Sequence, residues 1–199
     1  CREQMVPEMW RLMEGTEYSQ FLQNFRIAGG LAEGRHRGAP FNDGDFYKWL
    51  ESACAVYAMT RDTELEGIIE SVIPIIAKAQ RSDGYIHTQV LAQERGNERE
   101  ARAFQDRFNF EMYNMGHLLT AACIHHRATG RTNFLTVARK TADYLYETFL
   151  NASPEGARSS VCPSHYMGMV ELYRTTGDAR YLGLARKFLE LRDQVKDGG

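Results

Sequence analysis

The thirty residues from Glu111 to Lys140 decide the fold, and they read EMYNMGHLLTAACIHHRATGRTNFLTVARK. In their first half, apolar side chains recur at steps of three and four residues, which is the period of one helix face. Gly130 follows that face directly, where a helix C-terminus favours a residue that can adopt a positive φ. A second apolar stripe then runs from Phe134 to Phe149. The stretch therefore predicts two antiparallel helices joined by a very short turn.

The same helix pair returns 47 residues further along the chain. Segments 129–140 (TGRTNFLTVARK) and 176–187 (TGDARYLGLARK) are identical at six of twelve positions. A fainter copy begins upstream at Trp49, with Arg61 in place of the glycine. A shared turn at a fixed offset is the signature of repeated helix pairs. The sequence thus predicts an all-α fold of repeated antiparallel helix hairpins.

Composition limits the classes of function. The chain has 199 residues, of which 43% are hydrophobic and 25% charged, with a formal net charge of −2. This is an ordinary globular mixture. The charge balance gives no reason to expect nucleic acid or an anionic membrane as a partner. No apolar run reaches the roughly 18–20 residues that span a bilayer.

Local signals predict the elements around the repeats. Asp43 or Asp45 is expected to cap the helix that runs to about Thr60. Pro74 is expected to kink or divide the next helix, over residues 62–80. Residues 85–90 alternate in polarity and are interpreted as a possible short strand.

Repeated helix pairs must stack to bury their apolar faces, either in an open solenoid or in a closed α/α toroid. In a toroid the first helix of each pair lines the inside, and the inner helices run parallel, so that their N-termini meet at one mouth. Long loops precede each of these helices, whereas the opposite ends have tight turns, which favours a toroid with a pocket. Seven polar residues at or near these helix starts are the candidate substrate-binding residues: Asp43, Asp45, Glu111, Tyr113, Asn114, His117 and His165.

Each candidate also has a structural interpretation. His117 can be a partly buried histidine satisfied by one hydrogen bond, or a neutral imidazole that binds sugar hydroxyls. Asp43 and Asp45 at a helix N-terminus would be stabilised as anions, which suits a hydrogen-bond acceptor better than a general acid. His165 lies one position out of register with His117 by the 47-residue offset, so the direction of its side chain stays open.

The sequence offers no metal site of its own. Its four cysteines form no Cys-x-x-Cys pair, and Cys54 and Cys123 lie in apolar helical stretches, where they are expected to be small core residues. The adjacent His125 and His126 lack a matching third ligand nearby. We therefore assign no metal ligand to this chain.

Four stretches carry a family resemblance: FNDGDFYKWLE (41–51), DGYIHT (83–88), EMYNMGH (111–117) and CPSHYMGMVELY (162–173). In this order they resemble glycoside hydrolase family 127, the β-L-arabinofuranosidase-like enzymes and relatives that act on plant glycans. The resemblance covers nearly all 199 residues. It implies a bacterial enzyme with an (α/α)6 barrel, of which residues 1–199 would be about the N-terminal half as a single segment. The remainder of the barrel would then be its packing partner, and the isolated segment would be marginally stable or self-associating.

The resemblance also implies roles for residues. In the family, the histidine that matches His117 lies in the sugar pocket. The nucleophile is a cysteine held on zinc with a glutamate and two further cysteines, in the later half of the barrel together with the acid–base glutamate. No residue of this chain matches those groups, so no catalytic residue is assigned, and zinc is expected only in the full-length protein. Many relatives carry Gly-His-Pro-Glu where this chain has Val-Cys-Pro-Ser at 161–164, which leaves substrate choice open.

The favoured function is a glycoside hydrolase that releases L-arabinofuranose or a related sugar from plant-type glycans, with an oligosaccharide or glycoside as its partner. The alternatives are a non-catalytic helical-repeat scaffold that binds protein, a sugar epimerase and an unsaturated uronyl hydrolase. A scaffold would have short loops on both faces and no polar cluster at each inner-helix start. The sequence leaves a cytoplasmic or a periplasmic location equally open.

Overall fold

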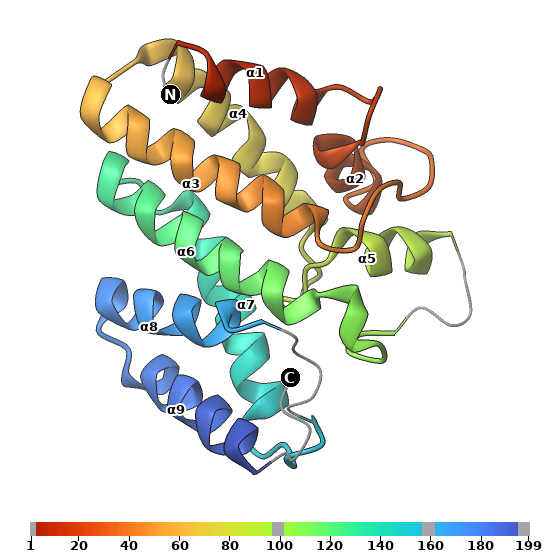
Figure 1. The fold of residues 1–199 in the computed structure, drawn as a ribbon, viewed down its shortest axis with the longest axis vertical. Helices are drawn as coiled ribbons and strands as arrows, with labels where there is room; N and C mark the ends of the chain where they lie inside the picture. The colour runs from red at the N-terminus through yellow and green to blue at the C-terminus, as the bar shows by residue number, and fades with distance from the viewer. Residues whose placement is uncertain (1–2, 97–101, 157–161, 195–199) are drawn as a thin grey trace.

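The computed structural model describes residues 3–96, 102–156 and 162–194, and these ranges contain helices and loops but no strand (Figure 1). The helices are α1 (Met5–Glu14), α2 (Phe21–Ala28), α3 (Asn42–Thr60), α4 (Thr63–Ala79), α5 (Thr88–Arg95), the short 3-10 helix η1 (Arg107–Asn109), α6 (Glu111–Thr129), α7 (Asn133–Phe149), α8 (Ser164–Thr176) and α9 (Ala179–Asp193). The predicted all-α class is confirmed.

Three antiparallel hairpins, α3–α4, α6–α7 and α8–α9, form the body of the fold. Gly130 and Gly177 end the first helix of their pairs with φ of 75° and 74°, as their sequence positions predicted. Arg61 takes the same left-handed conformation with φ of 54°. Its guanidinium Nη1 donates to the Ala128 carbonyl oxygen at 2.8 Å. This bond helps to explain why the first hairpin can turn without a glycine.

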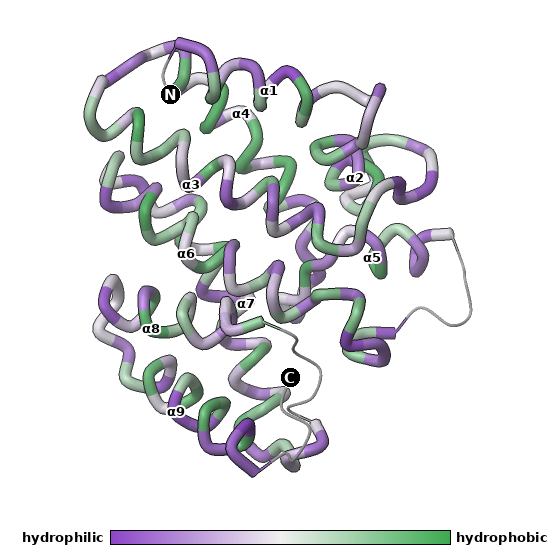
Figure 2. Tube along the Cα trace, in the orientation of Figure 1, coloured by the Kyte–Doolittle hydropathy of each residue, from purple (hydrophilic) through white to green (hydrophobic). Residues whose placement is uncertain are grey.

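The first helices of the three hairpins lie in one layer, with α6 between α3 and α8, and run in the same direction (Figure 1). Apolar residues recur along every long helix (Figure 2), and their buried members form one continuous core. This is the arrangement of part of an α/α toroid. In the ranges that the structure describes, no helix combines the length and the hydrophobicity that a bilayer crossing requires.

The predicted strand at residues 85–90 is wrong, because helix α5 begins at Thr88. The Asp43 carboxylate accepts hydrogen bonds from the Thr88 backbone N–H at 2.7 Å and from the Thr88 hydroxyl at 2.6 Å. The Nδ1 atom of His87 accepts from the Val90 backbone N–H at 3.4 Å. Two side chains thus bind the free N–H groups of the first turn and start a helix there.

Two further local expectations are corrected. Neither Asp43 nor Asp45 caps α3, because that helix begins at Asn42 and its N-cap residue is Phe41, which makes no side-chain capping bond. Pro74 does not divide α4, which is continuous from Thr63 to Ala79. Pro74 is exposed, so the carbonyl group that loses its helical hydrogen bond can face water.

A polar cluster at the turn end joins the first two hairpins. The buried His125 lies 2.7 Å (Nε2) from Glu70 Oε1, and Arg131 Nη1 lies 2.9 Å from the same oxygen. Asn133 Nδ2 donates to Glu70 Oε2 at 2.9 Å. Burial alone would raise the pKa of Glu70, but these donors lower it below its ordinary value. The ionised carboxylate of Glu70 is therefore the form that the fold favours.

We expect Glu70→Gln to reduce stability in a pH-dependent way. A carboxyl group whose pKa is lower in the folded state stabilises the fold above its unfolded pKa, and this contribution disappears as the pH falls through the folded value. The free energy of unfolding of the wild type should therefore exceed that of the variant by about 1 kcal/mol at pH 7. This difference should shrink below about pH 4.5, the ordinary pKa of Glu70. Urea unfolding at several pH values measures it. A difference that stays constant down to pH 3 would contradict this role.

Candidate functional site

A row of polar side chains crosses the three inner helices. We define this polar row as Asp45 and Lys48 on α3, Tyr113 and His117 on α6, and Ser164 on α8. Lys48 Nζ lies 3.1 Å from Asp45 Oδ1 and donates to the Tyr113 hydroxyl oxygen. The rings of Tyr113 and His117 meet edge to face, with centroids 4.7 Å apart. Ser164 Oγ lies 3.3 Å from His117 Nε2, which completes the row.

Helical spacing explains why these side chains align. Asp45 and Lys48 are three residues apart and Tyr113 and His117 four apart, so each pair lies on one face of its helix. Because the inner helices run in the same direction, their first turns lie side by side. Ser164 is the first residue of α8. The row therefore lies at the loop end of the bundle.

Glycines bring the inner helices into backbone contact beneath the polar row. A Cβ atom on Gly116 would lie 2.2 Å from the Ser164 carbonyl carbon, and one on Gly168 would lie 2.4 Å from the Gly116 carbonyl oxygen. A Cβ atom on Gly44 would lie 2.5 Å from the Tyr113 ring. Only glycine permits such approaches. The distance between Ser164 and His117 is thus fixed by the helix backbones.

The electrostatics of the polar row keep His117 neutral. Burial, and to a smaller extent the positive charge of Lys48, lower its pKa to about 4, although the Asp45 carboxylate opposes this shift. A neutral imidazole has one nitrogen that donates and one that accepts. His117 can therefore exchange hydrogen bonds with hydroxyl groups in both directions at neutral pH.

Asp43 and Asn114 hold the loops of the mouth and are both buried. Both Asp43 oxygens bond Thr88, as described above. The Asn114 side chain accepts from the Gly44 backbone N–H at 2.7 Å and donates to the Pro40 carbonyl oxygen at 2.8 Å. These two predicted site residues therefore bond backbone and α5, behind the polar row.

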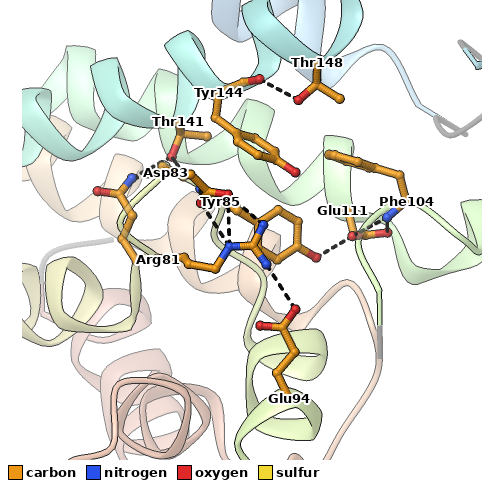
Figure 3. A network of polar contacts seen from close by, with 11 residues as sticks. Arg81, Asp83, Tyr85, Glu94, Phe104, Glu111, Thr141, Tyr144 and Thr148 are labelled. Atoms are coloured by element: carbon orange, nitrogen blue, oxygen red, sulfur yellow. Dashed lines mark hydrogen bonds and ion pairs between the residues drawn. The ribbon is translucent and has the colours of Figure 1, made fainter. Parts of the chain in front are cut away.

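Glu111 binds the loop that precedes α6 (Figure 3). It is 1% exposed, and its carboxylate accepts from the Tyr85 hydroxyl and, at 2.9 Å to each oxygen, from the Phe104 backbone N–H. Burial raises the pKa of Glu111, and the hydrogen bonds oppose that shift only in part. Glu111 thus joins segment 102–110 to the Tyr85 loop.

Arg81 extends this network towards α5 (Figure 3). Its guanidinium pairs with Asp83 at 2.8 Å and with Glu94 at 3.0 Å, and lies over the Tyr85 ring at 4.6 Å from the centroid. The two loops and α5 are therefore linked by side chains. This network connects the loops at the loop end of the bundle.

His165 faces away from the polar row. Its ring packs edge to face on Phe188 of α9, with centroids 4.6 Å apart, and its Nδ1 lies 3.1 Å from the Cys162 carbonyl oxygen. Burial lowers the pKa of His165 to about 4, although the Cys162 contact opposes it. Of the seven predicted residues, the structure brings Asp45, Tyr113 and His117 together in the row and places the other four around or behind it.

Lys48 was absent from the predicted site residues. Its position three residues after Asp45 places both side chains on one helix face, and this spacing was the available signal. The local sequence carried no signal for the tight packing of Ser164 against α6, because this packing depends on glycines that lie on two helices.

The sequence analysis assigned no metal ligand to this chain. Across residues 3–96, 102–156 and 162–194, no three His, Cys, Asp or Glu side chains come together as a metal ion would require. Cys54 and Cys123 are buried in the core. A zinc site built from these residues alone does not fit, so we derive no chemical step through a metal.

Comparison with curated proteins finds a similar enzyme. The non-reducing end β-L-arabinofuranosidase of Bifidobacterium longum subsp. longum is 34% identical over 186 residues, which cover 88% of this chain and 27% of that protein. The chain thus spans about a quarter of the length of this relative. The activity of the relative therefore belongs to a protein much longer than these 199 residues.

Solved structures of related enzymes also resemble this chain. A GH127 β-L-arabinofuranosidase from Geobacillus stearothermophilus T6 superposes with a TM-score of 0.84 at 33% identity, over 98% of this chain and 31% of that one. A second GH127 β-arabinofuranosidase has a TM-score of 0.79 at 30% identity, with the same coverage of both chains. The model of the β-L-arabinofuranosidase GH127 catalytic domain matches residues 1–197. The chain therefore belongs to the glycoside hydrolase family 127 catalytic domains.

Proposed function

We propose that the full-length protein is a glycoside hydrolase that acts on β-L-arabinofuranosides, and that the polar row forms one wall of its sugar pocket. The observation that carries the proposal is the neutral, half-buried His117 between Tyr113 and Ser164. The names of the related enzymes support the sugar that we propose.

The polar row has the chemistry that a sugar needs. A furanose presents hydroxyl groups that both donate and accept hydrogen bonds. The Asp45 carboxylate accepts, the Lys48 ammonium donates, and the His117 ring and the hydroxyls of Tyr113 and Ser164 can do both. The row binds and orients the sugar, and the nucleophile, the acid–base group and any zinc would come from the remainder of the barrel.

The surface of α1 supports the proposal that further barrel helices pack against this segment. Met5, Met9 and Leu12 are 60%, 39% and 42% exposed. They are spaced at i, i+4 and i+7, which places them on one helix face. Contiguous apolar surface of this kind is typical of an interface.

His117→Ala in the full-length enzyme tests the function. We expect kcat/KM on a β-L-arabinofuranoside to fall about ten- to a hundredfold, because one positioned hydrogen bond to the reacting sugar contributes roughly 1–3 kcal/mol. The melting temperature should change little, since the His117 side chain is only half-buried. Release of arabinose and thermal melting are the measurements.

The matched control is His126→Ala. His126 lies on the same helix at the turn end, with its Nδ1 atom 2.9 Å from the Arg131 carbonyl oxygen, and its loss should leave the rate unchanged. Full activity of the His117 variant on every arabinofuranoside tested would make His117 a structural histidine.

A further inference from the structure

Besides donating to a sugar, Lys48 contacts two other members of the polar row. Its ammonium group donates to Asp45 and to the Tyr113 hydroxyl oxygen, and Nζ lies 4.8 Å from the centroid of the Tyr113 ring. The side chain is 43% exposed. Lys48 therefore bridges α3 and α6 at the edge of the proposed pocket.

The contact with Lys48 determines the direction of the Tyr113 hydroxyl. Because an ammonium group can only donate, the phenol oxygen must accept, and its own proton points elsewhere. Within the described residues, Lys48 is the only hydrogen-bond partner of this hydroxyl. The O–H group is thus a donor without an acceptor among the described residues, and the ring that carries it contacts His117.

The same ammonium group acts on His117. The Tyr113 ring is near both groups, because its centroid lies 4.8 Å from Lys48 Nζ and 4.7 Å from the centroid of the imidazole. The charge of Lys48 also disfavours a second positive charge on His117. One lysine therefore influences two neighbouring sugar-binding groups, one through a hydrogen bond and one through its charge.

We infer that Lys48 is a positioning residue of the sugar site, which holds the Tyr113 hydroxyl as a hydrogen-bond donor to a sugar oxygen and holds the Tyr113 ring against His117. The inference rests on the proposed function and extends it to a residue on α3. By this inference, a residue on α3 orients two groups on α6.

A double-mutant cycle in the full-length enzyme tests the link through Tyr113. Lys48→Met and Tyr113→Phe should each lower kcat/KM on a β-L-arabinofuranoside about tenfold, as the loss of one oriented hydrogen bond does. The double variant should be little worse than either single one, because both changes remove the same donor. Lys48→Arg keeps a donor and should recover part of the loss. Lys140→Met, which changes an exposed lysine on α7, is the control and should have no effect.

A second measurement needs no substrate. Titration of His117 by NMR in the full-length protein should give a higher pKa in Lys48→Met than in the wild type. The positive charge of Lys48, which lowers this pKa, is then gone, and the Asp45 carboxylate, which raises it, is left. Lys140→Met should leave the titration unchanged. A lysine that only stabilised the fold would lower the melting temperature without moving this pKa.

Three results would overturn the inference: losses that multiply in the double variant, a Lys48→Met enzyme with full activity, or a His117 titration that does not move. A wild-type enzyme without activity on any arabinofuranoside would instead refute the proposed function. In that case the NMR titration still decides whether Lys48 controls its two neighbours.

Discussion

Gly116→Ala should destabilise the protein by about 3 kcal/mol or more, at the upper end of the cost of overpacking a core. The new Cβ atom would lie 2.2 Å from the Ser164 carbonyl carbon, 2.3 Å from its oxygen and 2.4 Å from the His165 backbone nitrogen. All three atoms are backbone, so no side chain can rotate away, and α8 must move as a unit. The melting temperature should fall by about 6–12 °C on the scale of a domain of this size.

The control for this prediction is Gly183→Ala. Gly183 is an exposed residue inside α9, and no heavy atom of the described residues lies within 4 Å of an added Cβ. Alanine favours a helix interior over glycine by roughly 0.5–1 kcal/mol, so this variant should be slightly more stable. A Gly116 variant that melts within about 1 °C of the wild type would show that α6 and α8 are not in backbone contact.

Glu111→Ala should cost about 3 kcal/mol, because it leaves one buried and one partly buried donor without an acceptor. These donors are the Tyr85 hydroxyl and the Phe104 backbone N–H. Segment 102–110 loses its link to the body of the fold at the same time. We expect a lower urea midpoint and faster proteolysis within this segment.

Tyr85→Phe gives the matched comparison for Glu111. It removes one donor but leaves the Glu111 carboxylate bonded to the Phe104 N–H, so it should cost only about 1 kcal/mol. Equal losses from both substitutions would mean that the link to Phe104 contributes nothing. The two variants therefore separate the contribution of the Tyr85 hydroxyl from that of the bond to Phe104.

The hairpins were predictable because their signals are local. The apolar period of α6 and the glycines at 130 and 177 depend only on neighbouring residues, and the structure has both where the sequence placed them. The start of α5 was missed because it depends on Asp43, which lies 45 residues from Thr88. An alternating pattern carries no information about such a distant bond.

For the candidate site, the sequence proposed one end of the bundle but could not give the direction of each side chain. Successive residues of a helix turn by about 100°. Tyr113 and His117 therefore share a face, whereas Asn114 turns towards α3 and the Pro40 loop. His165 likewise turns towards α9, one position after Ser164. A one-residue difference in register decides between a place in the polar row and a core contact, as Ser164 and His165 at the start of α8 show.

The comparisons favour the glycosidase over the scaffold, the epimerase and the uronyl hydrolase, since the family model and the related enzymes are all of one hydrolase family. The loops that the scaffold hypothesis required to be short instead carry side-chain networks that include Glu111 and Arg81. The sugar itself remains a proposal that His117→Ala can test.

The backbone contact of α6 and α8 has a consequence for how this sequence can diverge. Where two helices are separated by side chains, each substitution at the interface changes their spacing, and the residues above move with them. Here Gly116 and Gly168 set the spacing, so Tyr113, His117 or Ser164 can be exchanged while the positions of their Cα atoms are retained. Single substitutions in the polar row can therefore change its chemistry without a compensating change in the core.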